Sequence, residues 1–90
     1  MATPDAENIP GYSFLKYVLE ALVEDRDQLH IDPSIDQLGV LLTVRVSDRD
    51  MGKLIGKNGQ TVKALRTLLR LIGGATSQRV NLKILEPQKP

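Results

Sequence analysis

Hydrophobic residues follow two spacings along this chain, and each spacing predicts one kind of secondary structure. Over residues 14–25 they recur every three or four positions, which predicts a helix with Ser13 as its N-cap. The helix would pack on a sheet through Phe14, Leu15, Val18, Leu19 and Leu22. Further on, a spacing of two predicts a short strand over residues 29–32 and a half-buried strand over residues 40–46. The segment from Pro33 to Gly39 is predicted to be a loop, short enough for antiparallel pairing.

The second half of the chain predicts two helices and a last strand. Ser47 precedes Asp50 by three positions, the spacing of a capping box, so a short helix is expected to begin there and to end at Gly56. The strongest periodic signal predicts a helix over residues 60–72, ended by two glycines. Its inner face would carry Val62, Leu65, Leu69 and Ile72. Alternating residues then predict a strand from Val80.

These elements occur in the order α-β-β-α-α-β, which places the chain in the α+β class. Two helices between the last two strands make a connection long enough for parallel pairing. We therefore predict a three-stranded mixed sheet with three helices on one face, in a single domain over residues 12–86. Residues 1–11 are predicted to be a flexible N-terminal segment, and residues 87–90 a C-terminal tail.

The net charge of +1 hides a difference between the two halves. Residues 1–50 hold four basic and ten acidic residues, whereas residues 51–90 hold eight basic residues against Glu86 alone. This asymmetry indicates an anionic partner for the second half. The alternative is a polarised but merely solvated surface.

Several classes of function lack the residues that they need. The chain has no cysteine and a single histidine, His30, so we expect neither a metal site nor a cofactor. It contains no set of residues arranged for nucleophilic or acid–base catalysis, and we expect no enzymatic activity. Gly52 and Gly56 are one residue too close for the phosphate loop of nucleotide hydrolases. No apolar run approaches the roughly 20 residues of a membrane span, which predicts a soluble, intracellular protein.

The most informative stretch is Gly56-Lys57-Asn58-Gly59, a tight turn between two predicted helices. The second helix begins at this turn, so its backbone N–H groups would offer a phosphate-binding position. The glycines would allow another backbone to approach closely. The outer face of that helix carries Lys63, Arg66 and Arg70 and no acidic residue, whereas ordinary solvated faces mix both signs. We therefore favour phosphate binding over a solvated face.

Residues 54–62, with their Gly-x-x-Gly turn, resemble the signature of KH domains, which hold about four nucleotides of single-stranded nucleic acid. The order of elements is similar to that of type II KH domains. Over most of its length the chain resembles small bacterial single-KH proteins of the KhpA type, above all in residues 50–59 and 63–68. One departure is the segment 73–78, which carries no basic residue.

This resemblance implies a cytoplasmic protein that binds single-stranded RNA, as an RNA chaperone or post-transcriptional regulator with effects on cell shape and cell-wall homeostasis. It also implies a homodimer, or a heterodimer with a larger KH protein of the KhpB or Jag type. In this chain Gly56, Lys57, Asn58 and Gly59 would contact the sugar-phosphate backbone, and Ile55 and Val62 would line the groove or the core beneath it.

The expected mechanism is binding without chemistry. The turn and Lys57 would fix one phosphate, and the bases would lie over an aliphatic groove edged by a strand. Neighbouring phosphates would be screened by Lys53, Lys63, Arg66 and Arg70. An alternative is a protein-interaction module in which the glycine turn is only structural. The apolar face of the helix predicted over residues 60–72 is wide, since it extends to Ala64, Leu68 and Leu71. This width supports dimerisation.

Overall fold

The computed structural model describes residues 8–85, apart from the side chain of Lys57. The predicted tail and most of the predicted N-terminal segment lie outside these residues. The elements, in chain order, are helix α1 (Tyr12–Leu22), the 3-10 helix η2 (Arg26–Gln28), strands β1 (His30–Asp36) and β2 (Gly39–Arg45), helix α2 (Asp48–Ile55), the 3-10 helix η3 (Lys57–Gly59), helix α3 (Gln60–Thr76) and strand β3 (Val80–Leu85). The predicted order α-β-β-α-α-β is confirmed.

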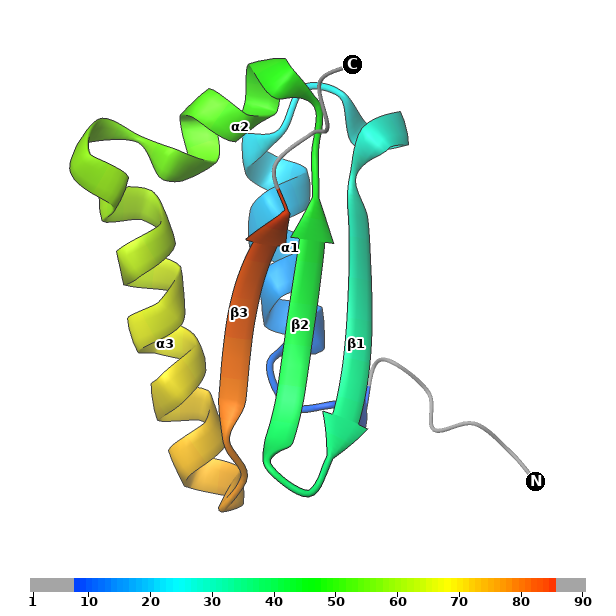
Figure 1. Ribbon diagram of the computed structural model, residues 1–90, viewed down its shortest axis with the longest axis vertical. Helices are drawn as coiled ribbons and strands as arrows, with labels where there is room; N and C mark the ends of the chain where they lie inside the picture. Colours follow the sequence, from blue (N-terminus) through cyan, green and yellow to red (C-terminus); the bar gives the residue numbers. More distant parts are fainter. Residues whose placement is uncertain (1–7, 86–90) are drawn as a thin grey trace.

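The three strands form one mixed sheet in the order β1-β2-β3. Strand β1 is antiparallel to β2, whereas β3 is parallel to β2. The three α-helices lie on one face of this sheet, with α3 beside the β3 edge (Figure 1). This is the α+β, type II arrangement predicted from the sequence.

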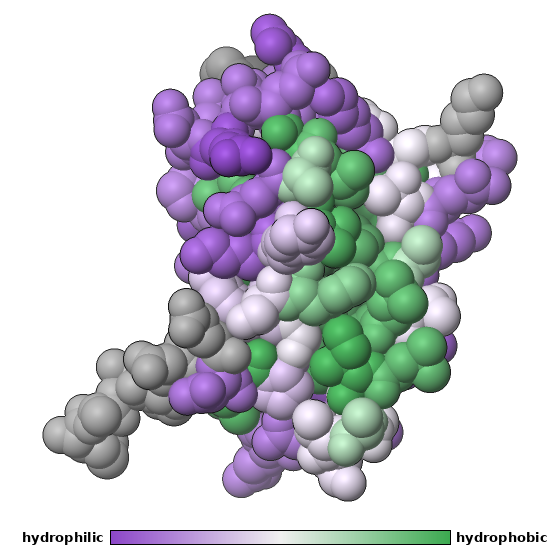
Figure 2. Space-filling model, turned by 180° about the vertical axis from the view of Figure 1, so that it is seen from behind, coloured by the Kyte–Doolittle hydropathy of each residue, from purple (hydrophilic) through white to green (hydrophobic). Residues whose placement is uncertain are grey.

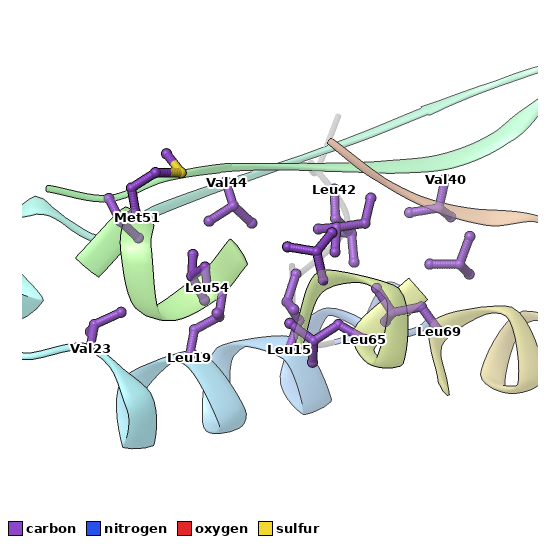
Figure 3. Close-up of a cluster of buried hydrophobic side chains, with 14 of the residues drawn as sticks. Leu15, Leu19, Val23, Val40, Leu42, Val44, Met51, Leu54, Leu65 and Leu69 are labelled. Atoms are coloured by element: carbon purple, nitrogen blue, oxygen red, sulfur yellow. The ribbon is translucent and has the colours of Figure 1, made fainter. Parts of the chain in front are cut away.

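The core lies between the sheet and the helices. Val40, Leu42 and Val44 alternate along β2 and point to the helical side, as the spacing of two predicted (Figure 3). They meet side chains from both long helices, including Leu15, Leu19, Leu65 and Leu69 (Figure 3). Full burial of one such side chain stabilises the fold by about 1.5–3 kcal/mol. The same contacts therefore hold α3 against the sheet and place its outer face.

The prediction of a loop from Pro33 to Gly39 is wrong. Strand β1 continues through Pro33 to Asp36, and the reversal takes only two residues. Proline is tolerated here because β1 is an edge strand. The backbone N–H of Leu38 donates to the carboxylate of Asp36 at 2.7 Å, which closes the turn. The result is a hairpin, and its predicted antiparallel pairing is confirmed.

The start of α1 also differs from the prediction. Its N-cap is Gly11, in the left-handed region with φ of 86°, and not Ser13. A side chain at Gly11 would collide with Leu69, so the backbone itself packs on α3 there. Ile9 is buried, and its carbonyl accepts the N–H of Tyr12 at 3.1 Å. Ile9 therefore belongs to the core, although it lies inside the segment predicted to be a flexible N-terminus.

Helix α3 does not end at the pair Gly73-Gly74. It runs through both residues to Thr76 and ends at Ser77, which has a left-handed φ of 60°. Gly73 is buried, and a Cβ there would collide with the carbonyl oxygen of Gln78. This glycine therefore lets the chain fold back closely on the helix, which the sequence pattern did not distinguish from a helix end.

Candidate nucleic-acid interface

The turn between α2 and α3 is built from left-handed backbone conformations. Ser47 is the N-cap of helix α2, and its hydroxyl accepts the N–H of Asp50 at 3.2 Å, as predicted. The helix ends at Gly56, with φ of 62°. Asn58 and Gly59 follow with φ of 58° and 72°. A Cβ at Gly56 would lie 2.8 Å from the hydroxyl of Thr61, so glycine is required by space as well as by φ.

The turn is open to solvent. Gly56 and Asn58 are exposed and Gly59 is half-buried. No side chain caps the N-terminus of α3, where the backbone N–H groups and the helix dipole favour an anion. The side chain of Lys57 lies outside the described part of the protein, so its predicted contact with the sugar-phosphate backbone stays a prediction.

A groove of about 250 Å³ adjoins the turn. Its lining comes from α2, from the turn, from α3 and from β3: Met51, Ile55, Gly59, Val62, Lys63, Arg66 and Ile84. The floor of the groove is aliphatic, and the cationic side chains of Lys63 and Arg66 line it as well. Ile55 and Val62 were predicted to line this groove or the core beneath it, whereas Met51 and Ile84 were not predicted. The alternation of β3 turns Ile84 toward the helical side, and only the parallel pairing with β2 brings it to this groove.

The three basic residues predicted on the outer face of α3 are all exposed. Lys63 and Arg66 line the groove. Arg70 lies one turn further on and shares with Arg66 a smaller hollow of about 80 Å³ against β3. Within residues 8–85, none of the three forms an ion pair with a carboxylate. Their charges therefore remain available to an external anion.

Lys53 has a different environment. Its ammonium group lies 3.0 Å from the carboxylate of Glu24, which also pairs with Arg49 at 3.5 Å. The hydrogen bond from Lys53 lowers the pKa of Glu24 below its usual value, and Arg49 adds to this effect. Lys53 does not line the groove. Its charge is thus partly engaged within the fold, unlike those of Lys63 and Arg66.

Asp50 connects the short helix α2 to the end of α1. Its fully buried carboxylate accepts the backbone N–H groups of Glu24 and Asp25, each at 2.9 Å, and the hydroxyl of Ser47 at 3.2 Å. The hydrogen bond from Glu24 is the main cause of a lowered pKa of Asp50, which burial opposes. The capping-box spacing predicted only a role at the helix start for Asp50, because the partners of its carboxylate lie 25 and 26 positions away in the sequence.

Residues 8–85 contain no cluster of three or more histidine, aspartate or glutamate side chains that could hold a metal ion. Among the same residues, no helix combines the length and hydropathy needed to cross a membrane.

The model of one protein family, described as the KH domain of KhpA and KhpB, matches residues 12–84. The chain belongs to this KhpA/KhpB family. The match runs from the start of α1 into β3, so it includes the turn, the groove and the exposed cations of α3.

Members of the KhpA/KhpB family align with most of the chain. A protein of Chlamydia caviae named "RNA-binding protein KhpA" is 36% identical over 81% of this chain and 94% of its own length. The protein of the same name from Aquifex aeolicus is 37% identical over 82% of this chain and 99% of its own length. A third, from Streptomyces coelicolor, is 38% identical over 67% of this chain and 76% of its own length.

Proposed function

We propose that this protein binds single-stranded RNA through the Gly56–Gly59 turn and the groove between α3 and β3. The observation that carries the proposal is that one groove is lined by Gly59 of the turn and by Lys63 and Arg66, which pair with no carboxylate within residues 8–85. Membership in the KhpA/KhpB KH family, whose relatives are named RNA-binding proteins, supports RNA as the nucleic acid.

Binding follows from the chemistry of the groove. The backbone N–H groups at the start of α3, together with Lys57, take one phosphate. Lys63 and Arg66 neutralise its neighbours, and the bases lie on Ile55, Val62 and Ile84. Within the described part of the chain no aromatic side chain lines the groove, so the bases are held by aliphatic contact and not by aromatic stacking. No step of this mechanism makes or breaks a covalent bond, and steady turnover of RNA in the presence of Mg²⁺ would contradict it.

The charge count predicts modest affinity and a clear dependence on salt. Each neutralised phosphate of a single strand contributes about 0.7 to the slope of log affinity against log salt. Three or four contacts therefore predict a slope of about −2 to −3 and micromolar binding.

The substitution Lys57→Asp/Asn58→Asp tests the role of the turn. It places two negative charges where the phosphate would bind, so we expect loss of RNA binding with an unchanged melting temperature. Fluorescence anisotropy with labelled RNA and thermal unfolding measure the two quantities. The matched control is Arg26→Asp/Gln28→Asp, which makes the same charge change in the 3-10 helix η2. Full RNA binding by the turn variant would contradict the proposal and favour a purely structural turn.

A second activity, protein association, is favoured by the outer apolar face of α3. Leu68 and Leu71 are 43% and 67% exposed, and Ala64, one helical turn before Leu68, is also exposed. Figure 2 shows the hydrophobic surface gathered on the helical side of the molecule. We propose that this face joins two copies in a homodimer, or one copy to a larger KH protein of the KhpB or Jag type. Two linked weak RNA sites gain affinity by avidity.

The family also supports a proposal about the cellular role. We propose a cytoplasmic RNA chaperone or post-transcriptional regulator, with an effect on cell shape and cell-wall homeostasis. Crosslinking in cells followed by sequencing of the bound RNA tests this role. Recovery of RNA by the natural protein but not by the turn variant is the expected result, and equal recovery by both would contradict it.

A further inference from the structure

The groove beside the turn is the first of three contiguous hollows between α3 and β3. It shares Arg66 with the second hollow, and the second shares Arg70, Val80 and Asn81 with the third. The third hollow measures about 380 Å³ and is also lined by Gly74, Gln78 and Arg79. It lies at the far end of α3 from the Gly56–Gly59 turn.

This third hollow has the chemistry of a phosphate and base site. Arg70 and Arg79 supply two exposed guanidinium groups, and Gln78 and Asn81 supply amides that can donate and accept hydrogen bonds. Among the residues that the structure describes, no acidic side chain lines any of the three hollows. Across residues 8–85, neither arginine pairs with a carboxylate. A merely solvated face would mix both signs of charge.

The backbone at Arg79 is fixed, which favours a binding role for its side chain. The carbonyl of Arg79 accepts the N–H of Val40 at 2.7 Å. Gly39 packs so closely on this residue that a Cβ there would collide with it. The chain therefore holds the Arg79 backbone at the start of β3 while its side chain remains exposed. A cation anchored in this way loses less conformational freedom on binding than one on a loose loop.

The three hollows together extend beyond the stretch of RNA that the turn alone would hold. A Gly-x-x-Gly turn holds about four nucleotides. Helix α3 has 17 residues and is therefore about 25 Å long, and Gly74 of the third hollow lies about 22 Å along its axis from Gly59 of the turn. We propose that Arg70, Gln78, Arg79 and Asn81 form a distal subsite, which binds further phosphates and bases of the same RNA strand. This inference rests on the proposed function.

The test compares two lengths of single-stranded RNA of random sequence, four and nine nucleotides, in the full chain. Only the longer RNA reaches the distal subsite, so its affinity should fall more steeply with salt than that of the shorter RNA. The variant Arg79→Gln removes one cation and should reduce the salt slope of the nine-nucleotide RNA by about 0.7. At about 0.1 M salt, this change corresponds to binding of that RNA that is about fivefold weaker. Binding of the four-nucleotide RNA should not change.

The control Arg26→Gln removes an exposed cation from η2, which leads into β1 at the opposite edge of the sheet. It should leave the binding of both RNAs unchanged. Equal salt slopes for the two RNAs, or full binding of the longer RNA by Arg79→Gln, would overturn the distal subsite and leave the proposed function intact. Failure of the natural protein to bind either RNA would overturn both.

Discussion

Gly73 and Gly74 are adjacent in α3, yet they have different surroundings. A Cβ at Gly73 would meet the backbone of Gln78 and Val80, because the chain turns back on the helix there. A Cβ at Gly74 would have no heavy atom within 4 Å. Glycine is therefore needed for packing at the first position, whereas at the second it only weakens the helix.

We expect opposite effects from alanine at these two positions. Gly74→Ala should raise the free energy of unfolding by about 0.5–1 kcal/mol, because alanine restricts the unfolded chain and favours the helix. Gly73→Ala should lower it by about 1–3 kcal/mol, since the added methyl group has no space. Urea unfolding measures both values, and each variant is the control for the other. A stabilising Gly73→Ala would show that the contact between α3 and β3 is looser than described.

Helix α2 depends on its neighbours for stability. With eight residues it is too short to be stable alone, since isolated helices under about 12–15 residues are marginal in water. The buried carboxylate of Asp50 joins its first turn to the backbone after α1. Because the Gly56–Gly59 turn follows α2 directly, the same connection supports the position of the candidate binding site.

This connection should depend on pH. The pKa of Asp50 is lowered from its usual 3.8 in the folded protein, so its contribution is complete above the unfolded-state pKa and is lost as the pH falls through the lowered value. Asp50→Asn should therefore reduce the free energy of unfolding at pH 7, and the difference from the natural protein should shrink below about pH 4. Urea unfolding across this pH range measures the effect.

The control for this prediction is Asp48→Asn, which removes an exposed carboxylate from the same first turn. It should change the free energy of unfolding by no more than about 1 kcal/mol, the size of a helix-dipole effect. Asp50→Asn should keep some acid sensitivity, because Glu24 also has a lowered pKa. An equal loss of stability in both variants at pH 7 would contradict the role assigned to the buried carboxylate.

At the scale of the whole molecule, α3 presents two surfaces of different chemistry. One carries the cations beside β3, and the other exposes Leu68 and Leu71. If the apolar face joins two copies, RNA binding and association can be changed separately by substitution.

We expect light scattering to find a dimer at high micromolar concentration. Leu71→Lys should shift it to a monomer, because the introduced ammonium group would be buried in the interface. The control Leu38→Lys changes a leucine of similar exposure, 73% against 67%, at the tip of the β1–β2 hairpin, and should leave the mass unchanged. A strict monomer for the natural protein at this concentration would remove the dimer proposal.

Local patterns were sufficient to predict the class of fold and the place of the turn. The alternation of Val40, Leu42 and Val44 and the periodicity of Val62, Leu65 and Leu69 each depend on residues close in sequence, and burial follows from them directly. The capping of α2 by Ser47 is equally local. The role of Gly73 was misread because an identical local pattern ends many helices.

The sequence by itself determined the order of elements, the two faces of α3 and the exposed cations, because hydrophobic spacing and charge are properties of short segments. Only the tertiary structure decided that Ile84 completes the groove, that Glu24 engages Lys53, and that Asp50 connects two helices. It also brought Arg70 and Arg79 to one hollow. Each of these contacts joins residues from different elements, and the spacing of residues within one element carries no information about such a contact.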